Sequence, residues 1–184
     1  MFNLSTQDVV LSIENAPLVN LDGLIYQEYD NFFGNNYELS FDNNKNFEKL
    51  EKQKGEINFQ RVKLKDDDMD IKKLKVFFMN SKITNALKQK FGIDLKFSSL
   101  DVWIDSKGYS LVPHVDDETI KLHLQIYLSD NSVGTSLYGQ NKEKIHTFKF
   151  ASNRGYALLN NEHSVHGVDQ VTEDGRMSLY ARYS

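Results

Sequence analysis

The stretch GYSLVPHVDDETIKLHLQIYLSD, residues 108–130, sets the fold that this sequence predicts. Its second half alternates between aliphatic residues and polar or aromatic ones. A period of two is typical of a β-strand whose two faces meet different surroundings. The non-aliphatic face carries Lys121, His123, Gln125 and Tyr127. This face either lines a pocket or is half-exposed to solvent, and the alternation alone leaves both open.

Short alternating runs of the same kind continue to the C-terminus, and turn residues separate them. Many short strands at this spacing favour an all-β sandwich or barrel with jelly-roll closure. We expect the helical segments upstream to pack on its outside. The predicted strands are residues 95–105, 109–115, 120–128, 134–139, 144–150, 155–160, 165–171 and 176–183.

The first part of the chain is mixed. Residues 17–33 carry apolar side chains at a spacing compatible with a helix. A second helix is predicted to begin at an Asn80 or Ser81 cap and to end at Gly92.

The intervening segments are more polar. Residues 57–64 alternate like a strand, whereas residues 41–56 read as an exposed, mobile connection. The charge run at residues 63–75 is interpreted as solvated surface.

The composition limits the kind of protein this chain can be. With 184 residues, 40% of them hydrophobic, it can bury the core of one domain. Because cysteine is absent, any metal must be held by His, Asp or Glu. A net charge of −4 counts against nucleic-acid binding driven by overall charge. The N-terminal MFNLSTQDVV does not resemble a signal peptide and no apolar run approaches a membrane span, so we expect a soluble cytoplasmic protein. The many Lys and Asn residues suggest an AT-rich microbial or viral genome.

A metal site is suggested by two ligand-type residues on one strand face. His114 and Asp116 are two residues apart, so their side chains project to the same side. A third ligand must come from elsewhere, and NNEHSVHGVDQV at residues 160–171 offers His163 and His166. Two histidines and one carboxylate with an open face are the ligand set of non-haem Fe(II) oxygenases.

The last predicted strand, RMSLYARY, adds an anion-binding group. Arg176 and Ser178 share one strand face and follow a predicted hairpin turn at Asp174–Gly175. If that face points inward, a buried guanidinium needs an anionic partner. A dicarboxylic acid would supply one through a bidentate pair. The alternative is that this face is exposed to solvent.

An H-x-D pair, a distant histidine and an R-x-S strand form a joint pattern that is more specific than its parts. In this pattern the sequence resembles the Fe(II)/2-oxoglutarate-dependent oxygenases, in particular their prolyl-hydroxylase-like branch. The resemblance covers residues 98–184 and is carried by GYSLVPHVDD, IYLSD, VGTSLYG and GYALLNNEHSVHGVDQVTEDGRMSLYARY.

The resemblance implies a double-stranded β-helix in which His114, Asp116 and His166 bind iron. It prefers His166 to His163, which would lie nearby in the pocket. It also implies that Arg176 binds the far carboxylate of 2-oxoglutarate.

Further residues are implied around that carboxylate and around the pocket. Tyr127 would lie beside it, and Ser178 shares the strand face of the arginine. Trp103 and Tyr109 lie where family members often carry tyrosines, but the spacing departs by a residue or two. Trp103 is equally interpreted as a core aromatic. The remaining candidates for the pocket lining are His123 and Gln125 on the alternating strand.

The activity implied by the resemblance is hydroxylation of an aliphatic carbon, with peptidyl proline as the preferred substrate. 2-Oxoglutarate would be converted to succinate and CO₂, and ascorbate would keep the iron reduced. A free amino acid, another small molecule or a nucleobase are alternative substrates. A non-catalytic β-helix binding module is an alternative from another class, although such a module need not keep all three ligands and the arginine. We expect one domain over residues 1–184, with a mixed α/β support region at 1–97 and the β-helix core at 98–184.

Overall fold

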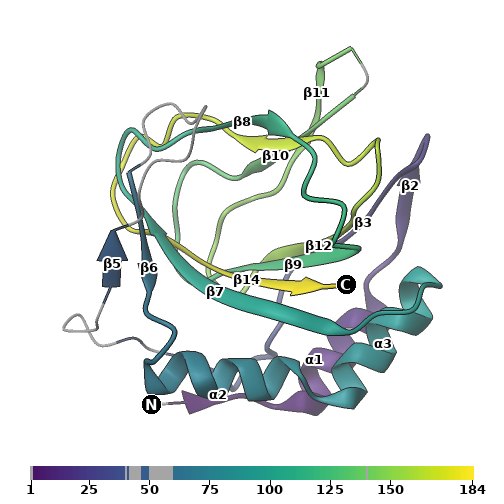
Figure 1. Ribbon diagram of the computed structural model, residues 1–184, viewed down its shortest axis with the longest axis vertical. Helices are drawn as coiled ribbons and strands as arrows, with labels where there is room; N and C mark the ends of the chain where they lie inside the picture. The colour runs from purple at the N-terminus through teal and green to yellow at the C-terminus, as the bar shows by residue number, and fades with distance from the viewer. Residues whose placement is uncertain (1, 40, 42–46, 50–59, 140) are drawn as a thin grey trace.

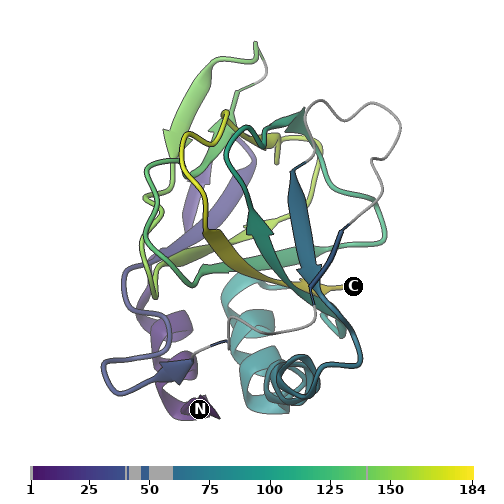
Figure 2. The ribbon, with the colours of Figure 1, turned by 90° about the vertical axis from the view of Figure 1, so that its left-hand side faces the viewer.

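The computed structural model describes residues 2–39, 41, 47–49, 60–139 and 141–184. Within these ranges, two antiparallel β-sheets face each other, and helices cover the outer side of the larger sheet (Figure 1). Figure 2 shows the same layers from the side, with the helices below the larger sheet. The mainly β architecture with flanking helices, a double-stranded β-helix, is the one that the sequence predicts.

The larger sheet has eight strands among the described residues, and β7, β9 and β14 lie near its middle. Its N-terminal strands come from the region upstream of residue 97, so both parts of the chain build one sheet. In spatial order the strands are β2 (Val19–Leu21), β3 (Leu24–Tyr29), β12 (Gly155–Leu159), β9 (Leu122–Tyr127), β14 (Arg176–Tyr183), β7 (Phe97–Asp105), β6 (Arg61–Leu64) and β5 (Phe47–Lys49).

The smaller sheet covers the inner face of the larger one and has four strands in the described part of the chain. In spatial order they are β11 (Lys144–Thr147), β10 (Thr135–Tyr138), β13 (His166–Val168) and β8 (Leu111–His114). Two further short strands, β1 (Phe2–Asn3) and β4 (Glu38–Leu39), pair with each other. The eight strands predicted after residue 95 are all present.

The helices begin at side-chain caps. The helix predicted near residue 80 is confirmed: the Asn80 side chain accepts a hydrogen bond from the backbone at Lys82, and Gly92 ends the helix in a left-handed conformation. None of the helices in the described ranges is long and apolar enough to span a membrane. The helices are α1 (Thr6–Asn15), α2 (Met69–Phe78) and α3 (Ser81–Phe91).

The main hydrophobic core lies between these helices and the outer face of the larger sheet. Ile13, Leu74 and Leu87 bring one helix each into contact with this face. The aliphatic side of β9 faces them, with Leu122, Leu124 and Ile126 fully buried. The opposite side of β9 is therefore turned toward the smaller sheet, because side chains alternate along a strand.

The helix prediction for residues 17–33 is wrong, because this segment forms β2 and β3. The two strands are joined by a tight turn at Asp22 and Gly23, both with positive φ. β3 lies between β2 and β12 and buries side chains on both faces. The apolar residues of this segment come from both faces of β3 and from its hairpin partner β2. Together their spacing in the sequence resembles that of a helix.

Three other expectations need amendment. Residues 63–75 are not only solvated surface, because they include the start of α2, which buries Ile71 and Leu74. The Asp174–Gly175 turn does not close a hairpin: it connects β13 in the smaller sheet with β14 in the larger one. In the predicted strand at 57–64, residues 61–64 form β6 and residues 57–59 lie outside the described residues. In the predicted connection at 41–56, residues 47–49 form strand β5, and most of the rest lies outside the described residues.

Candidate metal centre

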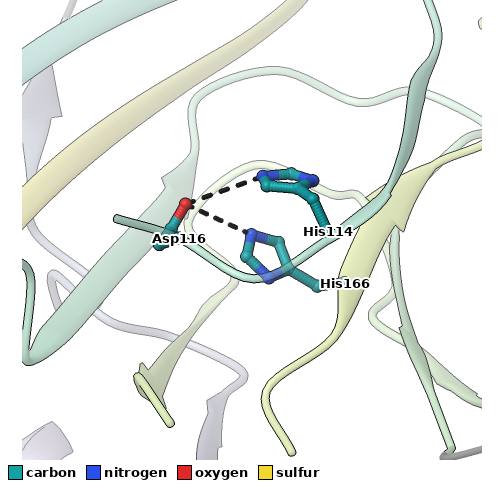
Figure 3. Close-up of side chains that lie close together, drawn as sticks. All are labelled: His114, Asp116 and His166. Carbon is teal, nitrogen blue, oxygen red and sulfur yellow. Dashed lines mark ion pairs between the residues drawn. The ribbon is translucent and has the colours of Figure 1, made fainter. Parts of the chain in front are cut away.

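The fold brings His114, Asp116 and His166 together between the two sheets. β8 and β13 are antiparallel neighbours, and His114 and His166 are directly paired across them. One ligand atom from each of the three residues lies within 4.8 Å of the others. The Nε2 atoms of His114 and His166 lie 3.6 and 3.8 Å from Oδ1 of Asp116 (Figure 3). In the described part of the chain, this is the one such group of three.

The backbone fixes which imidazole nitrogen of each histidine faces Asp116. Nδ1 of His114 lies 3.0 Å from the carbonyl oxygen of Val112, and Nδ1 of His166 lies 2.9 Å from that of Ser164. A carbonyl oxygen only accepts hydrogen bonds, so both Nδ1 atoms carry the proton. In the neutral rings, Nε2 then offers its lone pair toward Asp116, which is the arrangement of a metal-ligating histidine.

The second oxygen of Asp116 is held by two donors from the larger sheet. Nδ1 of His123, on β9, lies 2.6 Å from Oδ2, and the hydroxyl of Tyr180, on β14, donates to the same atom at 2.7 Å. Both donors leave Oδ1 as the atom that faces the two histidines. The inner face of the larger sheet thus orients the carboxylate for one-oxygen coordination.

The protonation states of Asp116 and His166 also suit a cation. Burial raises the pKa of Asp116, but the nearby ring of His114 and the hydrogen bond with His123 outweigh it and hold that pKa well below the usual range. Burial, together with the neighbouring His123, lowers the pKa of His166 to about 3. Burial lowers the pKa of His114, but the neighbouring Asp116 carboxylate and the Val112 carbonyl outweigh this and raise the pKa from its ordinary value, so a cation would compete with a proton at this ring. A carboxylate and two imidazoles form the donor set preferred by non-haem iron.

A buried row of charges lies further along the inner face of the larger sheet. Arg61, Asp105 and Arg176 are cross-strand partners on β6, β7 and β14. Arg176 and Asp105 are fully buried, and Nη1 of Arg176 donates to Oδ2 of Asp105 at 2.5 Å. The face that carries Arg176 and Ser178 therefore points inward, and the arginine already has an anionic partner within the protein, which the sequence analysis did not foresee.

Beside this arginine is a buried phenol without a normal hydrogen bond. The Tyr127 hydroxyl finds no partner of acceptable geometry in the described residues, although Arg176 and Thr135 act on it electrostatically. The ring of Tyr127 stacks on the ring of Phe150, with 4.0 Å between their centroids. The guanidinium of Arg176 lies 4.5 Å from the centroid of the Phe150 ring. An unsatisfied buried donor next to a guanidinium fits a carboxylate ligand, which would accept from both.

Comparison with known proteins identifies the architecture. No protein-family model and no curated protein matches the sequence. Among solved structures, a prolyl hydroxylase from Trichoplax adhaerens in complex with a peptide fragment of the hypoxia inducible factor oxygen degradation domain is 12% identical, with a TM-score of 0.65 over 97% of this chain and 88% of that one. A prolyl 4-hydroxylase from Phytophthora capsici is 14% identical, with a TM-score of 0.61 over 100% of this chain and 66% of that one. A 2OG-Fe(II) oxygenase family protein from Burkholderia pseudomallei is 13% identical, with a TM-score of 0.55 over 95% and 75% of the two chains.

The chain has the fold of the 2OG-Fe(II) oxygenases. At identities of 12–14% the likeness concerns the fold, and the roles of individual residues rest on the geometry of this chain.

The other residues singled out in the sequence occupy different parts of this oxygenase fold. Gln125 accepts from the Tyr156 hydroxyl at 2.7 Å and donates to Ser178 at 3.1 Å, so it joins the network between the metal group and the arginine. Trp103 and Tyr109 flank the guanidinium of Arg61 at 4.8 and 4.3 Å. His163 does not join the three clustered residues and lines a surface groove instead.

Three residues in the interior of the oxygenase fold, Tyr180, Asp105 and Arg61, were not predicted from the sequence. Tyr180 could have been found, because it lies on the same strand face as Arg176 and Ser178, two residues further on. Asp105 and Arg61 offered no such signal, since they are 71 and 44 residues from their partners Arg176 and Asp105.

Proposed function

We propose that this protein is an Fe(II)- and 2-oxoglutarate-dependent oxygenase that hydroxylates an aliphatic carbon. The observation that carries the proposal is the convergence of three ligand atoms within 4.8 Å between the two sheets, with a buried arginine on the inner face of the larger sheet. His114, Asp116 and His166 would hold the iron. Arg176 would bind the far carboxylate of 2-oxoglutarate, with Tyr127 and Ser178 beside it.

Bound iron, with 2-oxoglutarate and O₂, would supply the oxidising power, with succinate and CO₂ as products of the cosubstrate. The protein's own contribution is positioning. Nδ1–H of His123 and the hydroxyl of Tyr180 keep one carboxylate oxygen of Asp116 away from the metal. The smaller sheet covers the inner face, where Arg176 and Tyr127 are fully buried, so the far end of the cosubstrate would be shielded from water. Ascorbate would serve as the external reductant.

Peptidyl proline is the substrate that we propose. The solved structures that share the fold include prolyl hydroxylases, one of them with a bound peptide fragment. A groove of about 770 Å³ runs beside His114, which is partly exposed there. Its wall is largely apolar and includes Val112, Pro113, Val115 and Val165. An open groove next to the metal group would admit an extended peptide more readily than a closed pocket would.

Succinate release under air, with Fe(II), 2-oxoglutarate and ascorbate, tests the proposal. The panel consists of proline-containing peptides, the same peptides with alanine in place of proline, free amino acids and oligonucleotides. We expect release to be stimulated by the proline peptides and to be lost in the His166→Ala variant. Stimulation by oligonucleotides or free amino acids alone would overturn the prolyl assignment and leave the oxygenase proposal standing. Metal and 2-oxoglutarate binding without stimulated release by any of them would favour a binding module.

A further inference from the structure

The buried carboxylate of Asp105 is shared by two arginines from neighbouring strands. Nε of Arg61 donates to Oδ1 at 2.5 Å, and Nη2 of Arg61 donates to Oδ2 at 3.2 Å. Nη1 of Arg176 donates to Oδ2 at 2.5 Å. Arg61 thus makes a bidentate contact with Asp105, whereas Arg176 contacts Asp105 through a single nitrogen. The three side chains form one transverse row on the inner face of the sheet, because they are direct cross-strand partners.

Such sharing matters for any carboxylate that approaches Arg176. An arginine paired with a single buried carboxylate is locally neutral, so a second carboxylate would gain attraction from the guanidinium and lose as much by repulsion from the first one. A further cation on Asp105 offsets that repulsion. Removing the positive charge of Arg61 makes this region more negative by one unit, whatever other contacts Arg61 makes.

Arg61 is fixed in the orientation that this role requires. Its guanidinium lies 4.8 Å from the ring of Trp103 and 4.3 Å from the ring of Tyr109. Stacking between two aromatic rings suits a planar, delocalised cation and not a flexible ammonium group. The two aromatic contacts and the two hydrogen bonds to Asp105 together restrain the guanidinium in this position.

We propose that Arg61 is a positioning residue for the cosubstrate: by holding Asp105, it leaves Arg176 able to bind the remote carboxylate of a dicarboxylic acid. This inference rests on the proposed function. Arg61 lies on β6, outside residues 98–184, where the sequence resembles the oxygenases. The inference therefore gives β6 a role in the selectivity for a dicarboxylate over a monocarboxylate.

Charge-balanced variants test the inference. The affinities of 2-oxoglutarate and of 2-oxobutyrate, a keto acid that lacks the far carboxylate, are measured by calorimetry on anaerobic Fe(II)-loaded protein. Arg61→Met should weaken 2-oxoglutarate binding by between about tenfold and about 100-fold, the range for one unit charge several ångströms away inside a protein. Binding of 2-oxobutyrate should be unchanged. Arg61→Met combined with Asp105→Asn should restore 2-oxoglutarate binding to within about threefold of wild type, because one negative charge is removed with the positive one.

A purely structural role for Arg61 predicts a different pattern. In that case both keto acids would be affected equally and the double variant would bind no better than Arg61→Met, either of which overturns the inference. Should Arg61→Met fail to fold, Asp105→Asn alone decides: the inference expects 2-oxoglutarate to bind at least as tightly as to wild type, and weaker binding contradicts it. Wild-type protein that binds no 2-oxoglutarate at all would instead overturn the proposed function.

Discussion

The hydroxyl of Tyr180 donates a 2.7 Å hydrogen bond to Oδ2 of Asp116, across the space between the larger sheet and the loop after β8. The phenol is thereby tied to the central carboxylate of the metal group. Burial and the charge of Asp116 both raise the pKa of Tyr180 well above its ordinary value, so the hydroxyl remains a donor. In the proposed site, Tyr180 would therefore help to determine which oxygen of Asp116 meets the metal.

Removing this hydroxyl should weaken metal binding. In Tyr180→Phe, Oδ2 of Asp116 loses one of its two donors and the carboxylate can rotate, so we expect an affinity for Mn²⁺ that is lower by about tenfold. Calorimetric titration measures it. Tyr183→Phe is the matched control, because its hydroxyl bonds a backbone oxygen of α2, on the other side of the sheet. Equal affinities in Tyr180→Phe and wild type would contradict the orienting role.

Close contact between β8 and β13 should also be required for metal binding. A Cβ added to Gly167 would lie 2.7 Å from the carbonyl oxygen of Leu111 and 3.1 Å from the nitrogen of Pro113, both backbone atoms. In Gly167→Ala the two strands must move apart, and His166 moves away from His114. We expect a loss of metal affinity of about tenfold or more, by analogy with other changes that misplace ligands.

The control for that substitution is another glycine. Gly92→Ala introduces a side chain that meets no atom within 4 Å, although its φ of +67° is strained for alanine. This variant should lose stability, by about 1 kcal/mol, with unchanged affinity for the metal. A Gly167→Ala protein that keeps wild-type affinity would show that the strands tolerate separation.

The stability of the metal-free protein should depend on pH through His166. Burial lowers the folded-state pKa of His166 to about 3 from an ordinary value of 6.5. Between these values the unfolded chain binds more protons than the folded one, so this residue makes stability fall as the pH drops below 6.5. His114 contributes with the opposite sign, because its pKa is raised.

Chemical denaturation in the presence of a chelator, at about pH 7.5 and about pH 5, measures this dependence. The range stays above the ordinary pKa of carboxyl groups. In His166→Asn, the drop in the free energy of unfolding toward low pH should be smaller than in wild type. An identical drop in both proteins would show that His166 does not titrate in this way.

The C-terminal half of the fold could be predicted because aliphatic and polar side chains alternate along its strands. All six residues of β9 are buried, yet Leu122, Leu124 and Ile126 face the helices while His123, Gln125 and Tyr127 face the interior network. A buried strand in an ordinary core would read as a continuous apolar run. The polar residues on the inner face thus revealed the strand, whereas the alternation alone left open whether that face lines a pocket or meets solvent.

The N-terminal half was less readable because local sequence there does not report the tertiary contacts. α1 and α2 each bury only a few apolar side chains among charged and polar ones, such as Ile71, Leu74 and Phe78 in α2. In the site, the pattern of His114, Asp116 and His166 is visible in the sequence. The pairing of Arg176 with Asp105 is not, since it depends on the register between β14 and β7.

The central claim, that the clustered residues hold iron together with 2-oxoglutarate, is tested most directly by absorption spectroscopy without oxygen. Chelation of Fe(II) by the keto and near carboxylate oxygens of 2-oxoglutarate gives a weak visible charge-transfer band. We predict this band for the wild-type protein and its loss in His166→Ala, while Arg154→Met, a change in a surface arginine paired with Asp30, keeps it. A wild-type protein that shows no band at saturating Fe(II) and 2-oxoglutarate, or a His166→Ala protein that keeps it, would contradict the account.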